Sequence, residues 1–168
     1  MKKRSEGFSL IELLIVIVIL GILASISVAG LMASKRSANE GSVISSMRIL
    51  HGAQMTYAST YGGGEFAGDV GIGSLTAFST LRSFSLVDEV LGSGNKASYN
   101  FVGGREVSSS TSPAQFFFSA IPVSSDTVTR TGNHRFGIST DGIIRQDDIL
   151  FAQYSDISQV TSATAIGN

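Results

Sequence analysis

The 168-residue sequence has no cysteine, only two prolines and little charge, and each of these shortages excludes something. Without cysteine, neither a disulfide framework nor a thiolate metal site is possible. With two prolines against 19 glycines, we expect flexible loops and not rigid linkers. A formal net charge of −1 gives no electrostatic basis for binding nucleic acid, and no nucleic-acid site is evident.

A long apolar run is present near the N-terminus. Residues 1–7 form a leader with three basic residues and one acid, and positive charge before an apolar segment keeps that end cytoplasmic. From Phe8 to Ser34 the run spans 27 residues, and Glu12 is its only charge. As a helix it would be about 40 Å long, enough for a bilayer core of roughly 30 Å. The sequence therefore predicts a transmembrane helix at residues 8–34.

Glu12 needs a partner, because a carboxylate costs about 2.5–3.5 kcal/mol at the centre of a membrane span and less near its end. A plain single-span anchor gives this acid no purpose. If the chain is cut between Gly7 and Phe8, the new α-amino group of Phe8 becomes a cation at a similar membrane level. Pairing that amine with Glu12 of a neighbouring chain offsets the desolvation of both charges. Such a head-to-tail contact generates helical filaments when the rotation does not close.

The stretch GFSLIELL, residues 7–14, resembles the prepilin cleavage motif of bacterial type IV pilins and related pseudopilins. It has the basic leader, a glycine before the cut, a phenylalanine after it and a glutamate as fifth residue of the mature chain. The close resemblance covers residues 2–32. It implies that a prepilin peptidase cleaves the Gly7–Phe8 bond and that Phe8 becomes N-methylated. It also implies that Phe8 and Glu12 are the assembly residues.

Two glycines are expected to loosen the helix during assembly. Gly21 matches the glycine that pilin helices often carry in the middle of the apolar run. The kinking proline of the family would fall at Ala29, where this chain has none. The adjacent Gly30 would weaken the helix instead, by up to about 1 kcal/mol relative to alanine.

The remainder of the chain predicts an α+β fold with a long helix and a small antiparallel sheet. The resemblance implies the pilin fold, in which the apolar half of the helix protrudes and its amphipathic half packs on the sheet. Residues 35–61 continue the helix with an apolar stripe interrupted only at Gln54. The globular head is expected at residues 62–168, and within it residues 62–96 form a connection with one or two helical turns. Residues 97–146 form three or four strands, and residues 147–168 form a tail that covers a sheet edge.

The strand positions follow from β-branched and aromatic residues bounded by turn signals. In the segment 115–123, Phe116 and Phe118 should face one side of the sheet and Phe117 the other. Asp141-Gly142 is a two-residue hairpin signal. The expected strands are residues 97–102, 115–123, 135–139 and 143–146.

No constellation of residues points to catalysis, so we expect no enzyme. The two histidines, His51 and His134, lie in unrelated contexts, and no spacing suggests zinc. Asp141, Asp147 and Asp148 cluster near the hairpin. Because major pseudopilins often hold calcium in a C-terminal loop, the resemblance makes these acids weak calcium candidates. Solvated turn acids are the favoured interpretation, and no other metal or cofactor is expected.

Three functions remain open. The preferred one is a structural subunit of a type IV pilus, which passes once through the bacterial inner membrane and then polymerises into a homo-oligomeric cell-surface filament. The second is a pseudopilin of a type II secretion system. Both imply a prepilin peptidase, which also methylates, and inner-membrane assembly machinery as partners. The third is a membrane-anchored binding module that never polymerises and does not depend on Glu12.

Overall fold

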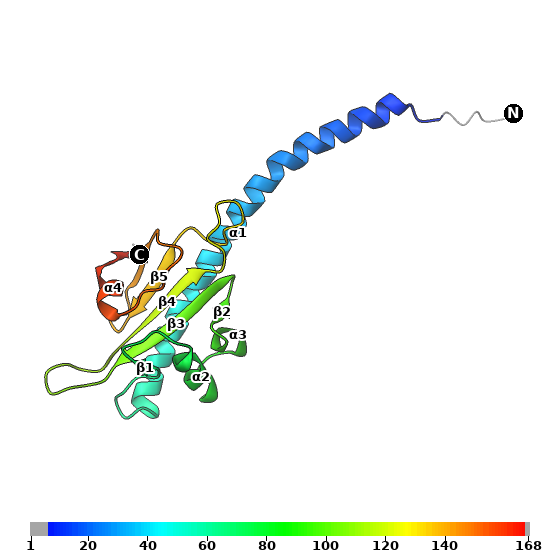
Figure 1. The fold of residues 1–168 in the computed structure, drawn as a ribbon. Helices are drawn as coiled ribbons and strands as arrows, with labels where there is room; N and C mark the ends of the chain where they lie inside the picture. Colours follow the sequence, from blue (N-terminus) through cyan, green and yellow to red (C-terminus); the bar gives the residue numbers. More distant parts are fainter. Residues whose placement is uncertain (1–6, 167–168) are drawn as a thin grey trace. The chain divides into compact units, whose positions relative to one another are not determined.

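The computed structural model describes residues 7–166 (Figure 1). These residues fall into two compact units that divide between Lys35 and Arg36. Helix α1, Leu10–Thr60, contributes to both units. In the first unit the apolar side chains from Leu10 to Leu31 are exposed. Within the described part of the chain, α1 is the one helix long and apolar enough to cross a membrane.

Helix α1 is regular through both predicted flexibility positions. Gly21 and Gly30 lie within the helix, and open space surrounds the place of an added Cβ at each. The hydroxyl groups of Ser25 and Ser27 donate to the carbonyl oxygens of Ile22 and Leu23, both at 2.8 Å. These bonds satisfy the polar atoms of the apolar segment within the helix itself. Loosening of the helix at these glycines during assembly stays a prediction.

The second half of α1 supplies the core of the globular unit. The predicted stripe is confirmed at Val43, Met47 and Leu50, which are fully buried against the sheet. Its last members differ, because Tyr57 is only partly buried and Tyr61 lies beyond the end of α1 and is 51% exposed. Gln54 interrupts the stripe in the sequence, yet it is as fully buried as its apolar neighbours. Its amide bonds to the backbone of Ala67, so the polar group is satisfied inside the core.

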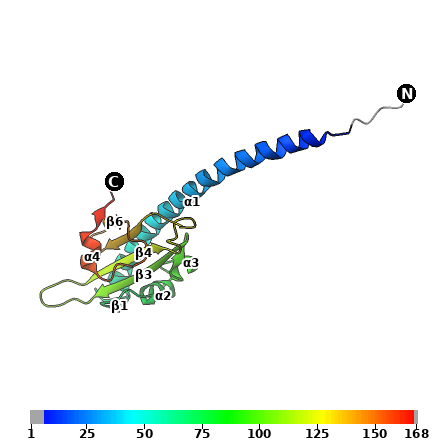
Figure 2. The same cartoon turned by 45° about the horizontal axis from the view of Figure 1, so that its top comes forward.

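The globular unit is α+β, as predicted, with one seven-stranded sheet in the order β1-β3-β4-β5-β6-β7 and β2 paired beside β3. The four longer strands are mutually antiparallel and form the predicted sheet, while the two-residue β1 pairs parallel to β3. In Figures 1 and 2, α1 passes behind β3 and β4. The elements after α1 are β1 (Asp69–Val70), α2 (Thr76–Ser83), α3 (Glu89–Gly92), β2 (Asn95–Lys96), β3 (Tyr99–Glu106), β4 (Gln115–Pro122), β5 (Arg135–Ser139), β6 (Ile144–Asp147), α4 (Ile157–Ser162) and β7 (Thr164–Ala165).

Strand β3 is longer than predicted. The sequence places its end at Val102, before a glycine pair, but the strand continues to Glu106. Gly103 lies directly opposite Phe118 of β4, and an added Cβ there would lie 2.3 Å from the phenyl ring. The glycine is therefore part of the strand because an aromatic side chain of the next strand occupies the space over it.

The two faces of β4 pack as the alternation predicts. Phe116 and Phe118 belong to the core formed with α1, whereas Phe117 packs on the opposite side with Tyr154 and Val160. The C-terminal segment thus covers a face of the sheet, and its strand β7 also pairs with β6 at the edge. Of the residues that the sequence suggests for this cover, Ile149, Leu150, Phe151 and Tyr154, only Tyr154 is fully buried. Phe151 is 81% exposed. The covering side chains Tyr154, Ile157 and Val160 recur every three residues, so the last two lie on one side of α4.

Two loops of contrasting character connect the strands. The β5–β6 hairpin lies where the Asp141-Gly142 signal predicts it, but its connection spans residues 140–143 and not two residues. The N–H of Gly142, at φ +75°, donates to the carbonyl oxygen of Ser139 at 2.9 Å. Residues 107–114, between β3 and β4, are rich in serine and exposed up to Pro113. Figures 1 and 2 show this loop extending beyond the ends of both strands. Its backbone is closed on itself, because the N–H of Ser109 donates to the carbonyl oxygen of Ser112 at 2.8 Å.

Candidate functional site: the helix start and the acidic hairpin

The predicted cleavage and assembly residues lie at the start of α1. Gly7 and Phe8 precede the helix, and Phe8 is 82% exposed. Glu12 lies in the first turn, and its Oε2 accepts a hydrogen bond from the backbone N–H of Ser9 at 3.1 Å. The scissile bond therefore lies outside the helix. Glu12 accepts a hydrogen bond from Ser9, the residue directly before the helix.

The Ser9–Glu12 bond is half of a capping box, in which a glutamate at the third helical position reaches back to the cap residue. The sequence interpretation assigned Glu12 to an intermolecular contact alone. The Ser-x-x-Glu spacing is the signal that predicts this cap. Glu12 can satisfy a free N–H of its own helix before any neighbour arrives. Its pairing with the Phe8 amine of another subunit stays a prediction.

The acids of the hairpin region are bound by arginines. The two oxygens of Asp147 accept from Nε and Nη2 of Arg135, at 2.9 and 2.6 Å. Burial alone would raise the pKa of Asp147, but the hydrogen bonds from Arg135, the N–H of Ile149 and the hydroxyl of Tyr154 outweigh it and lower the pKa below 3.8. Burial of the ring raises the pKa of Tyr154, and the hydrogen bond to the Asp147 carboxylate raises it further, to about 12.

Asp141 has a similar environment within its own turn. Its Oδ2 accepts from Nη2 of Arg145 at 2.7 Å, and its Oδ1 accepts from the hydroxyl of Ser139 and the N–H of Ile143. Burial opposes ionisation, yet these bonds lower the pKa of Asp141. A Ca²⁺ ion would have to displace an arginine from either aspartate, so the donor set does not suit this ion.

The third calcium candidate belongs to another cluster. Oδ1 of Asp148, a side chain that is 91% exposed, lies 3.6 Å from Nε2 of His134. On the other side of the ring, Nδ1 of His134 lies 3.4 Å from Oε2 of Glu40 on α1. The two carboxylates face opposite ring nitrogens and do not converge on one point. Across residues 7–166, no group of three or more His, Cys, Asp or Glu side chains is arranged to hold a metal ion.

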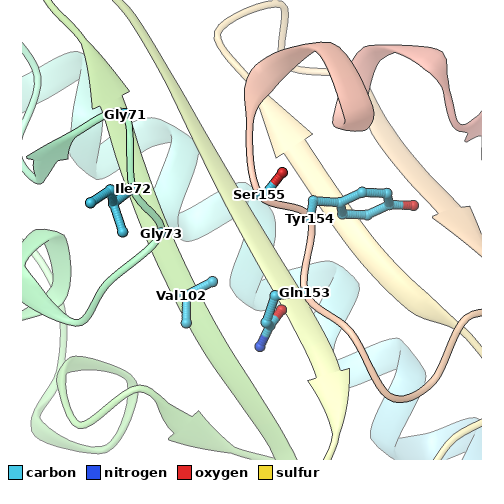
Figure 3. Close-up of a pocket in the computed structure, with 7 residues that line it drawn as sticks. All are labelled: Gly71, Ile72, Gly73, Val102, Gln153, Tyr154 and Ser155. Carbon is cyan, nitrogen blue, oxygen red and sulfur yellow. The ribbon is translucent and has the colours of Figure 1, made fainter.

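A shallow cavity lies on the sheet face that the C-terminal segment covers. It has a volume of about 350 Å³ and lies between Gly71-Ile72-Gly73 and Gln153-Tyr154-Ser155, with Val102 as its floor (Figure 3). Figure 3 shows the ring of Tyr154 pointing away from Val102. The hydroxyl of Ser119 donates to Oε1 of Gln153 at 2.6 Å. The lining is mainly apolar and includes no carboxylate, imidazole or amine, and the hydroxyl of its one titratable residue, Tyr154, donates to Asp147.

Comparisons of the sequence with known proteins find a family model and several curated relatives. The family model described as the prokaryotic N-terminal methylation motif matches residues 2–28. The chain is 46% identical over 55 residues to type II secretion system core protein G of Klebsiella pneumoniae, which is 33% of this chain and 39% of that protein. It is 45% identical over 56 residues to core protein G of Aeromonas hydrophila, a match that covers 33% of this chain and 39% of that protein.

A further relative, core protein G of Dickeya chrysanthemi, is 45% identical over 50 residues, 30% of this chain and 33% of that protein. The matches thus span well under half of the length of the curated relatives. No solved structure matches the chain. The methylation motif, the relatives and the long apolar helix joined to an α+β sheet unit agree with one another. The chain therefore carries a prepilin-type N-terminal segment, similar to those of type IV pilins and pseudopilins.

Proposed function

We propose that the chain is a pseudopilin of a type II secretion system. It is a structural subunit without catalytic activity that is cleaved after Gly7, N-methylated at Phe8 and polymerised into a helical filament. The proposal rests on the similarity of the chain to core protein G of several bacteria, together with the methylation motif at residues 2–28. The sequence alone favours a type IV pilus subunit, and the comparisons favour the pseudopilin instead.

The geometry of the helix start supports the order of events. Gly7 and Phe8 are exposed and non-helical, so the prepilin peptidase can reach the backbone at the cut. The exposed apolar side chains from Leu10 to Leu31 hold the uncut subunit in the inner membrane and later form the filament core. Cleavage creates the Phe8 amine, and Glu12 of a neighbouring subunit then pairs with it. The other partners are the inner-membrane components that drive assembly.

The proposal is tested by deleting the gene and measuring which proteins the bacterium releases into the medium. We expect secreted enzymes to accumulate in the periplasm, and the complementing chain, isolated from the envelope, to begin with N-methylated Phe8 by mass spectrometry. Abundant sheared surface filaments of this chain, together with normal secretion, would identify a pilus subunit instead. A chain that keeps residues 1–7 and stays monomeric would identify an anchored binding module.

A matched pair of variants isolates the cleavage step. Gly7→Phe places a bulky side chain directly before the bond to be cut, whereas Gly41→Ala changes a glycine in open space on α1. We expect Gly7→Phe to accumulate as the uncut, membrane-bound form and Gly41→Ala to be cut normally. Equal processing of both would show that the cut does not fall after Gly7.

A further inference from the structure

The buried guanidinium group of Arg135 joins the C-terminal segment to the sheet. The side chain of Arg135, on β5, is 7% exposed. Its Nε and Nη2 donate to the two oxygens of Asp147 at the end of β6, and its Nη1 donates to the carbonyl oxygen of Ala152 at 2.8 Å. Its guanidinium carbon lies 3.8 Å from the centroid of the Tyr154 ring. One side chain thus connects β5, β6 and the loop before α4.

The oxygens that surround Arg135 are of the kinds that calcium uses. Ca²⁺ takes carboxylates, often through both oxygens, and backbone carbonyl oxygens, with about six to eight ligands in total. Here a carboxylate with both oxygens engaged and a backbone carbonyl are directed at a guanidinium instead. The planar fork of arginine matches a carboxylate through two parallel hydrogen bonds. The guanidinium therefore has the position and the partners of a structural cation.

No acceptor site of Asp147 is left over. Beyond the two bonds from Arg135, its Oδ1 accepts from the N–H of Ile149 at 3.0 Å and its Oδ2 from the hydroxyl of Tyr154 at 3.0 Å. An ionised carboxylate offers about four lone-pair sites. All of them are used within the protein, so a metal ion gains a ligand here only by breaking one of these bonds.

We propose that Arg135 takes the place of a bound divalent cation in fixing residues 147–156, so that the stability of the globular unit depends on this arginine and is indifferent to calcium. Because the charge is covalently attached, its stabilisation does not vary with the concentration of a free ion, as that of a bound ligand would. Arg135 acts in this way on the folding of the globular unit. This role holds whether the filament serves secretion or forms a surface pilus.

The test compares the effect of calcium with the effect of replacing Arg135 on the thermal stability of the full chain in detergent micelles. Thermal unfolding is followed by circular dichroism in EGTA and in CaCl2, and CaCl2 is titrated into the protein by calorimetry. We expect the wild-type midpoints to coincide and the titration to show no saturable heat. Arg135→Gln should lower the midpoint by roughly 6–15 °C in both solutions, because loss of the buried guanidinium leaves the partly buried carboxylate of Asp147 without its counter-charge.

The matched control is Arg48→Gln, the same change on an exposed arginine of α1, and its midpoint should equal that of the wild type. If Arg135→Gln does not fold, Arg135→Lys retains the charge without the fork and Tyr154→Phe removes one bond to Asp147, and both should show smaller losses. A wild-type midpoint that rises in CaCl2 or falls in EGTA overturns the proposal. So does an Arg135→Gln protein that unfolds like the wild type. Neither readout involves cleavage or secretion, so failure here is distinct from failure of the proposed function.

Discussion

Gln54 and Ala67 form a closed pair of hydrogen bonds across 13 residues of sequence. The side-chain amide of Gln54 donates to the carbonyl oxygen of Ala67 and accepts from its N–H, each at 2.8 Å. Both residues are buried, so water cannot replace either bond. The pair fixes the segment that leaves α1 to the buried face of the same helix.

Replacing Gln54 by leucine should therefore destabilise the protein although it completes the apolar stripe. The change leaves the N–H and carbonyl of Ala67 buried without partners, at a cost of roughly 2–4 kcal/mol in the free energy of unfolding. Urea unfolding of the full chain in micelles measures this loss. Ser45→Ala, on an exposed position of the same helix, is the control and should change little. A stabilised Gln54→Leu protein would show that the stripe needs no polar member.

The glycine opposite Phe118 gives a second prediction. Gly103→Ala places a Cβ 2.3 Å from the phenyl ring and should lower the free energy of unfolding by about 1–3 kcal/mol through overpacking. Gly41→Ala, in open space on α1, should instead raise it by roughly 0.5–1 kcal/mol because alanine favours the helix. Opposite signs for the two glycine-to-alanine changes are the expected result of parallel urea titrations. Equal signs would contradict the close packing of β3 on β4.

Acid should weaken the anchoring of the C-terminal segment. The pKa of Asp147 is lowered from 3.8 in the folded protein, so the folded state binds its proton less tightly than the unfolded chain. The stabilisation is therefore present above pH 3.8 and is lost as the pH falls through the lower, folded-state pKa. We expect Asp147→Asn to be less stable than the wild type at neutral pH, and the difference to shrink at about pH 3. Urea titrations at the two pH values check this, and a difference independent of pH would contradict it.

Two substitutions at Glu12 separate its charge from its capping bond. Glu12→Gln keeps an oxygen that can accept from the N–H of Ser9 but loses the charge, whereas Glu12→Ala loses both. If pairing with the amine of a neighbouring Phe8 requires the charge of Glu12, both variants should still insert into the membrane. Their filament yield should fall by roughly tenfold or more. Glu106→Gln, at the exposed end of β3, should assemble normally. Filament yield is measured after shearing or cross-linking. A normal yield for Glu12→Gln would show that Glu12 acts in assembly through its capping bond and not through its charge.

Periodicity was sufficient to predict the frame of the fold. The apolar spacing along α1 and the alternation around Phe117 identify which faces are buried, because burial of a helix or strand repeats with its own geometry. The Asp141-Gly142 signal likewise places the last hairpin, since Gly142 supplies the positive φ that such turns need.

Pairings between distant segments could not be predicted in this way. Gly103 reads as a strand end until Phe118 is placed opposite it, and Gln54 reads as a defect in the stripe until Ala67 is placed beside it. Arg135 shows no local signal at all, because its partners lie 12 and 17 residues further along the chain. The Ser9–Glu12 cap is different, since its Ser-x-x-Glu spacing was available in the sequence.

The serine-rich loop between β3 and β4 has a practical consequence. Its backbone and side-chain bonds from Ser109 to Ser112 are among its own residues, and the tip contributes nothing to the core. Exposed loop tips of this kind tolerate insertions. A short peptide tag placed between Ser110 and Thr111 should leave the pairing of both strands intact. The subunit could then be labelled in living cells, so that its movement through the envelope is followed directly.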